Sequence, residues 1–114
     1  GNAEGKGIKE YNNGDKYEGD YKNDRREGRG IYSYKNGDRY EGHWKKGSRN
    51  HYGIYSYHNG DSYDGSWRDD KKDGKGVYYY SNGDRRMGNY HNDKPVGKHV
   101  MLKKSGEVQI IFFD

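Results

Sequence analysis

Aromatic residues and glycine alternate with polar residues in short segments along this 114-residue chain. In the Tyr-Glu-Gly-Asp-Tyr segment at residues 17–21, the tyrosines and the glycine occupy every second position, and the acids stand between them. Because the side chains of a β-strand point alternately to its two faces, this pattern predicts a strand with one aromatic and one polar face. A second kind of segment, at residues 28–34, places two glycines and two tyrosines on one face and Arg29, Ile31 and Ser33 on the other.

Both segments recur at an interval of 23 residues. Tyr-Glu-Gly at residues 17–19 returns at 40–42 and, as Tyr-Asp-Gly, at 63–65. Asn-Gly-Asp follows the second segment in each copy, and Asn-Gly favours a hairpin turn because both central residues accept positive φ. Longer polar stretches are expected to form the turns within the units, at residues 22–27, 45–50 and 68–73. Several elements kept in phase over a fixed period indicate a repeat architecture.

The repeats predict an all-β fold. Because all connections are short, we expect an elongated, single twisted antiparallel sheet, a meander of about ten strands built from β-hairpins. The expected domain is a single array over residues 1–114, with a partial repeat at 5–16, repeats at 17–39, 40–62 and 63–85, and a degenerate C-terminal capping repeat at 86–114.

The composition points to an aromatic core in place of an aliphatic one. Leu, Ile, Val and Phe together number only 12, but the chain holds 14 Tyr and 2 Trp, and each packed aromatic side chain buries about 150–250 Å². Glycine on the aromatic face leaves bare backbone on which a neighbouring ring lies flat, so we expect rings to stack from one hairpin to the next. The chain has no Cys, which excludes disulfides and thiolate metal sites.

Patterns that carry catalysis or bind metals are missing from the sequence. The Gly-x-Gly pieces do not extend to a G-x-G-x-x-G loop, and their fixed period favours a structural role. The five His occupy different repeat positions and lack a zinc-ligand spacing. Glu18, Glu41 and Asp64 share one repeat position, which favours a solvated column on the polar face over a catalytic pair. We therefore expect no enzyme activity, no catalytic residue, no metal site and no cofactor.

The spaced aromatics and glycines resemble the MORN (membrane occupation and recognition nexus) repeat family. Its unit approximates Y-x-G-x-W-x-x-G-x-x-x-G-x-G followed by a hairpin that ends in Asn-Gly or Asp-Gly. The copy that matches best combines residues 63–67 with Gly-Lys-Gly at 74–76 and Asn-Gly-Asp at 82–84. The likeness covers residues 5–106, nearly the whole chain.

Several positions depart from the family pattern. His51 and His99 replace glycines, and Arg86 replaces the leading tyrosine of its copy. The last unit also has Gln109, Ile111 and Phe113 where Tyr, Gly and Trp are expected. We interpret the late changes as a C-terminal cap, since a terminal repeat lacks a neighbour.

The resemblance implies a groove lined by aromatic residues, which in some family members binds an extended or helical segment of a protein partner; other members form homodimers. The candidate partner-binding residues are Tyr17, Tyr21, Tyr34, Tyr40, Trp44, Tyr57, Tyr63, Trp67, Tyr80 and Tyr90. Some of these rings must only pack, and the sequence does not separate the two sets.

Basic residues concentrate in the turns within the units and offer a weaker candidate site for anionic phospholipid. They are Lys22, Arg25, Arg26, Lys45, Lys46, Arg49, Lys71 and Lys72. Acids in the same turns dilute the field, which favours solvated turns. Nucleic acid is disfavoured as a partner because the aromatic residues already have a structural role.

These observations favour a non-catalytic scaffold or adaptor that binds a protein segment, and the resemblance implies a place in the cytoplasm, in a cytoskeletal or ciliary assembly. The alternatives are a peripheral membrane adaptor, and the regulatory MORN region of a larger enzyme such as a lipid kinase or a SET-type methyltransferase. No signal peptide is visible, and because the chain starts with Gly rather than Met, we expect it to be a fragment.

Overall fold

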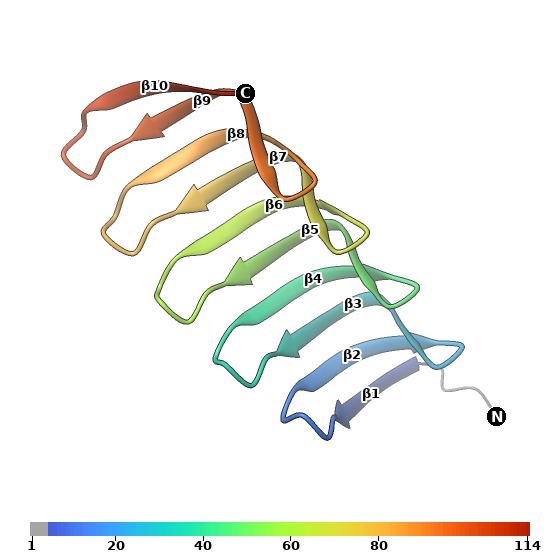
Figure 1. Ribbon diagram of the computed structural model, residues 1–114. Helices are drawn as coiled ribbons and strands as arrows, with labels where there is room; N and C mark the ends of the chain where they lie inside the picture. The colour runs from blue at the N-terminus through green and yellow to red at the C-terminus, as the bar shows by residue number, and fades with distance from the viewer. Residues whose placement is uncertain (1–4) are drawn as a thin grey trace.

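Residues 5–114 form one antiparallel sheet of ten strands in meander order (Figure 1). This computed structural model describes residues 5–114, so the first four residues of the expected array lie outside the described residues. The strands are β1 (Gly5–Glu10), β2 (Lys16–Lys22), β3 (Arg25–Ser33), β4 (Arg39–Lys45), β5 (Ser48–Ser56), β6 (Ser62–Arg68), β7 (Lys71–Tyr79), β8 (Arg85–His91), β9 (Lys94–Leu102) and β10 (Val108–Phe113). The predicted all-β meander is confirmed.

The two kinds of turn differ from the prediction. Within a unit, the expected long polar turn shrinks to two residues, because Asn23 and Asp24 both take positive φ (53° and 62°) and close a tight hairpin. The flanking residues of the polar stretch therefore belong to paired strands. Between units, only Gly37 takes positive φ (99°), while the Asn36 side chain accepts a hydrogen bond from the amide of Asp38 (2.9 Å).

Eight glycines lie in one line across the sheet, each opposite the next in the strand register: Gly7, Gly19, Gly30, Gly42, Gly53, Gly65, Gly76 and Gly88. The ring of Tyr17 lies directly on Gly30, so that a Cβ added there would overlap the tyrosine hydroxyl. Tyr40 lies on Gly53, and Tyr63 on Gly76, in the same way. Only a residue without a side chain leaves room for these rings.

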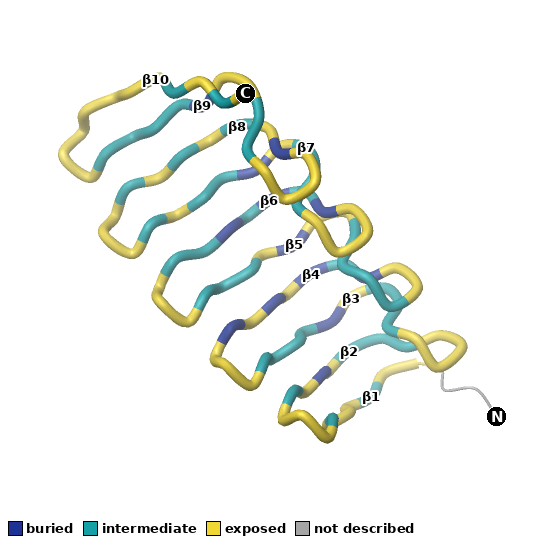
Figure 2. Tube along the Cα trace, in the orientation of Figure 1, coloured by how far each residue is buried: buried dark blue, intermediate teal, exposed yellow. Residues whose placement is uncertain are grey.

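The core is a single row of buried aromatic rings on one face of the sheet, which we call the aromatic face. Tyr17, Tyr40 and Tyr63 are fully buried, at 0% exposure, and Trp44 and Trp67 stand between them. Neighbouring rings meet edge to face, with centroids 5.0–5.5 Å apart, an arrangement that aromatic pairs prefer. The buried positions recur along successive hairpins (Figure 2).

Every buried polar group of this row that belongs to the three tyrosines and two tryptophans has a backbone partner. The Tyr40 hydroxyl donates to the carbonyl oxygen of His43 (2.8 Å), and the Trp44 indole donates to that of Gly30 (3.2 Å). Tyr17, Tyr63 and Trp67 repeat these bonds. The buried polar atoms of these five side chains therefore keep a hydrogen bond, and their burial does not incur the cost of an unsatisfied polar group.

The last unit reverses the arrangement of ring and glycine. In the earlier units a ring of one strand lies on a glycine of the following strand, whereas in the last unit the ring comes from the following strand and lies on a glycine of the preceding one. Arg86 stands where a tyrosine is expected, and His99 stands where the glycine beneath that tyrosine is expected. The fully buried His99 ring now lies on Gly88 from the opposite strand. It continues the row, with its centroid 5.4 Å from Tyr90 and 4.8 Å from Phe113.

Candidate functional site

The structure divides the ten candidate partner-binding aromatics into two sets. Six of them are buried in the core and offer no free surface: Tyr17, Tyr40, Trp44, Tyr63, Trp67 and Tyr90. The other four, Tyr21, Tyr34, Tyr57 and Tyr80, are half-buried beside this row. Burial raises the pKa of Tyr57 to about 12. Only the half-buried tyrosines remain candidates on the aromatic face.

Three of the eight candidate lipid-binding residues also lie on the aromatic face. Arg26 and Arg49 sit over Trp44 and Trp67, with guanidinium carbons 4.8 and 4.7 Å from the ring centres. Lys72 lies 5.0 Å from the ring centre of Tyr63, and burial lowers its pKa. These cations stack on aromatic faces within the fold rather than forming a free basic row.

The five other candidate cations are exposed: Lys22, Arg25, Lys45, Lys46 and Lys71. Four of them surround a hollow of about 390 Å³ together with Asn23 and Glu27. The Glu27 carboxylate accepts a hydrogen bond from the Lys46 amide (3.1 Å), so one negative charge stands among the positive ones.

The face opposite the rings, here called the back face, is not uniformly polar. All of the exposed large hydrophobic residues among residues 5–114 belong to it by strand parity: Ile8, Tyr52, Ile54, Tyr79, Met87, Val108, Ile110 and Phe112. Exposed apolar residues rimmed by polar ones are typical of an interaction surface. From the sequence, this face was expected to carry a solvated column of acids together with residues such as Arg29, Ile31 and Ser33, and no interaction surface was predicted on it.

The acids and the apolar residues of the back face form one alternating row. Ile31 lies opposite Glu18 on one side and Glu41 on the other, and Ile54 lies opposite Glu41 and Asp64. The signal was present in the sequence, because Ile31, Ile54 and Val77 share one repeat position. We did not predict an interaction surface from this position, because isolated apolar residues among charged ones are also typical of an ordinary solvent-exposed surface.

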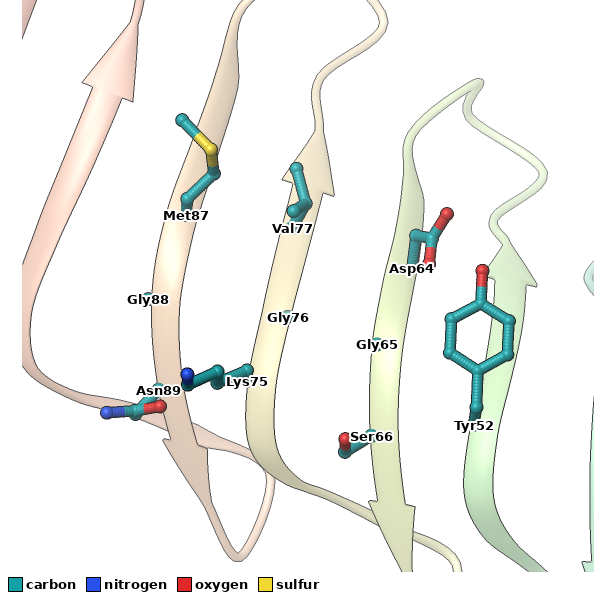
Figure 3. Close-up of a pocket in the computed structure, with 10 residues that line it drawn as sticks. All are labelled: Tyr52, Asp64, Gly65, Ser66, Lys75, Gly76, Val77, Met87, Gly88 and Asn89. Carbon is teal, nitrogen blue, oxygen red and sulfur yellow. The ribbon is translucent and has the colours of Figure 1, made fainter.

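A groove of about 540 Å³ crosses the back face over β5 to β8 (Figure 3). Gly65, Gly76 and Gly88 form its floor, since the rings that cover these glycines lie on the other side of the sheet. Two rows of side chains border the floor, and we call them the walls of the groove. Along its own strand, each floor glycine stands between one residue of each wall. One wall is Asp64, Val77 and Met87, and the other is Ser66, Lys75 and Asn89. The ring of Tyr52 lies at one end of the groove and extends toward Asp64.

The walls differ in charge and in hydrogen-bonding capacity. A hydrogen bond to Asp64, with some burial, raises the pKa of the Tyr52 phenol to about 12, so this phenol is neutral at physiological pH. Lys75 and Asn89 lie opposite each other in the register and supply an ammonium and an amide. Val77 and Met87 line the other side, and Met87 is 38% exposed.

The described part of the chain offers no arrangement that would hold a metal ion, since no three His, Cys, Asp or Glu side chains gather in residues 5–114. The same residues contain no helix of the length and apolarity that crossing a membrane requires.

Comparison with known proteins identifies one family. A model described as MORN repeat matches the chain four times, at residues 1–16, 17–39, 40–62 and 63–85. No curated protein matches the sequence.

Proposed function

The chain belongs to the MORN repeat family, and from this premise we propose that it is a non-catalytic scaffold module that binds a segment of a protein partner in the back-face groove. The observation that carries the proposal is the groove itself, floored by bare glycine backbone and bordered by the exposed side chains of Tyr52 and Met87. Rigid aromatic and apolar contacts beside polar groups are what recognition of a peptide segment requires.

The half-buried tyrosines of the aromatic face are the second candidate surface for the same function. Tyr34, Tyr57 and Tyr80 stand at one repeat position and are half-buried. The back-face groove is preferred because its floor and walls are open to solvent. Tyr34 and Tyr57 are already in contact with neighbouring rings, with ring centroids 4.5–5.8 Å apart.

A peptide selection tests the proposed site. A library of random peptides is selected on the chain and then assayed on Asn89→Trp, which places an indole over the groove. His43→Trp is the matched control, because His43 holds the same repeat position outside the groove. We expect selected peptides to bind the parent and His43→Trp but not Asn89→Trp. Equal binding to a folded Asn89→Trp would refute the back-face groove, and loss only in a folded Tyr34→Ala, Tyr57→Ala variant would assign binding to the aromatic face.

An anionic membrane surface is the second candidate function, favoured by the hollow that Lys22, Arg25, Lys45 and Lys46 surround. It predicts binding to vesicles that contain anionic lipid, weakened by added salt. Flotation of the chain with such vesicles at low salt tests it. We propose that either binding function operates in the cytoplasm, in a cytoskeletal or ciliary assembly. Both functions are compatible with a homodimer and with the regulatory region of a larger enzyme.

A further inference from the structure

We infer that β10 is the edge at which two copies of this chain pair, antiparallel and about a two-fold axis, so that their sheets join into one. This edge is separate from the back-face groove, and the inference does not rest on the proposed function. It follows from the exposure of β10, from the residues that prevent a further repeat from pairing there, and from the fit of β10 to a second β10.

The outer edge of β10 is apolar and carries no charge. Within residues 5–114 no strand pairs with this edge, because β10 is the last strand in the sheet order. Its six residues are Val, Gln, Ile, Ile, Phe and Phe, and the side chains of Val108, Ile110 and Phe112 are exposed on the back face. Proteins commonly protect an edge strand with charged residues, because an unprotected edge is a template for pairing with another chain.

β1, at the other end of the sheet, has that protection. It carries the charges of Lys6, Lys9 and Glu10, and two of its six residues are glycines, which weaken a strand. The two end strands therefore differ in kind. The contrast favours a contact that joins β10 to β10 over one that joins β10 to β1.

Ile111 prevents β10 from pairing with a following strand as β2, β4 and β6 do. In those strands a glycine holds the equivalent position, beside a bulge in the register, and a Cβ on Gly42 would overlap the Cα of Gly53 in the following strand. In the same geometry the Cβ of Ile111 would overlap a further repeat, or Gly7 in β1 of another copy. Gln109 also lacks the ring that would cover that glycine. What fits this edge is a strand in a regular register without a bulge.

The backbone of β10 presents its free hydrogen-bonding groups at alternate residues. The Lys103 amide donates to the carbonyl oxygen of Glu107 (2.8 Å), which makes these two residues a hydrogen-bonded pair at the start of the ladder between β9 and β10. Hydrogen-bonded pairs alternate along an antiparallel ladder. The odd-numbered residues of β10 therefore bond to β9, and the peptide groups of Val108, Ile110 and Phe112 point outward.

A second β10 matches these groups. With Ile110 opposite the same residue of the other copy on the two-fold axis, Val108 of each copy lies opposite Phe112 of the other, and each pair exchanges two hydrogen bonds. Residues opposite each other share a face of the sheet, so these side chains form one apolar strip on the back face. Phe113 lies opposite Glu107 of the other copy, so the register places no two like charges opposite each other.

Sedimentation equilibrium of the full chain over a range of concentrations tests the inference. Two six-residue strands form a contact smaller than the standard interface of about 1,600 Å², so we expect a monomer–dimer equilibrium with a Kd in the micromolar range. A chain that stays monomeric at millimolar concentration would overturn the inference and leave the edge to a strand of another protein. Oligomers that grow beyond the dimer would also overturn it, because only an end-to-end contact continues without closing.

Two lysine substitutions at exposed isoleucines locate the contact. Ile110→Lys places two ammonium groups opposite each other on the two-fold axis and should raise the Kd of the dimer by about tenfold or more. Ile8→Lys is the matched control, because Ile8 is 63% exposed on the strand at the other end of the sheet, and it should leave the Kd unchanged. Equal effects of the two substitutions, or a larger effect of Ile8→Lys, would overturn the assignment to β10.

Circular dichroism establishes whether each variant is folded. Should Ile110→Lys fail to fold, Phe112→Lys gives the same test at a side chain that is 76% exposed. It replaces the ring that lies opposite Val108 of the other copy, and it should also raise the Kd. A folded Phe112→Lys that dimerises as the parent does would overturn the inference.

Discussion

At the scale of single residues, one repeat position needs a left-handed backbone. Gly28, Gly74 and Gly97 hold this position with φ of 86°, 94° and 69°, and His51 holds it with φ of 60°. An L-residue with a Cβ is strained in this region by about 1–2 kcal/mol, whereas glycine is not. His51 therefore stores strain that the equivalent residues avoid. Its side chain is exposed, so little packing offsets that strain.

Replacing His51 with glycine should relieve this strain. We expect His51→Gly to raise the free energy of unfolding by about 1 kcal/mol, measured by urea denaturation. Gly97→Ala is the reciprocal control, because a Cβ there meets no atom within 4 Å and only backbone strain is added. It should lower stability by about the same amount. A His51→Gly variant less stable than the parent would contradict the strain argument.

At the scale of elements, a carboxylate joins each hairpin to the next. Asp38 accepts hydrogen bonds from the Tyr55 hydroxyl (2.7 Å) and from the amide of His58 (2.8 Å), both in the following repeat. Asp15 and Asp61 make the same two bonds to their own following repeats. These bonds could not be predicted from the sequence, because a bond to residues about 20 positions ahead leaves no local pattern.

Acid should weaken this junction. Burial raises the pKa of Asp38, but hydrogen bonds from Tyr55 and His58 outweigh it and hold the pKa below the ordinary 3.8. A carboxyl group whose pKa is lower in the folded chain than in the unfolded chain stabilises the fold while it is ionised. This stabilisation is complete above the ordinary pKa and is lost as the pH falls through the lowered pKa. Asp38→Asn should therefore cost about 1–3 kcal/mol at neutral pH, and the difference from the parent should shrink below pH 3.8.

Urea unfolding between neutral pH and strong acid measures the effect. Asp69→Asn is the control, because Asp69 lies in an exposed turn. A constant difference between Asp38→Asn and the parent across the whole pH range would show that the carboxylate charge does not stabilise the junction.

At the scale of the whole molecule, the fold is a ribbon in which each hairpin contacts its neighbours along the chain. The described residues extend 55 Å along one axis and 23 and 19 Å along the others, and each strand pairs only with the strands before and after it. Stability in such an array is a sum of repeat and nearest-neighbour contributions.

Removing one complete period should preserve the fold. Deletion of residues 40–62 brings β3 against β6, where Tyr63 replaces Tyr40 and Trp67 replaces Trp44 in the same register. We expect a folded, cooperative and less stable chain, with an unchanged far-ultraviolet circular dichroism band shape and a lower urea midpoint. Deletion of residues 40–61 is the control, because the extra residue left behind shifts the register by one and turns the aromatic side chains to the wrong face. Equal folding of both variants would refute the register argument.

The sequence alone determined the period, the strand alternation and the aromatic core of this protein. These features are local or strictly repeated: two-residue alternation shows a strand, and a glycine in phase with a tyrosine shows where a ring needs bare backbone. The same reasoning found the departures at His51, Arg86 and His99.

Only the tertiary structure decided which surfaces are free. Tyr40 and Tyr57 look alike in the sequence, but one lies on Gly53 beneath its neighbours and the other lies beside the row. The turn geometries, the exchange of ring and glycine between Arg86 and His99, and the carboxylate bonds between hairpins also depend on residues from different strands. The groove arises because one glycine line has rings on one side and open backbone on the other, and the side of the sheet on which a ring lies is settled by packing across strands.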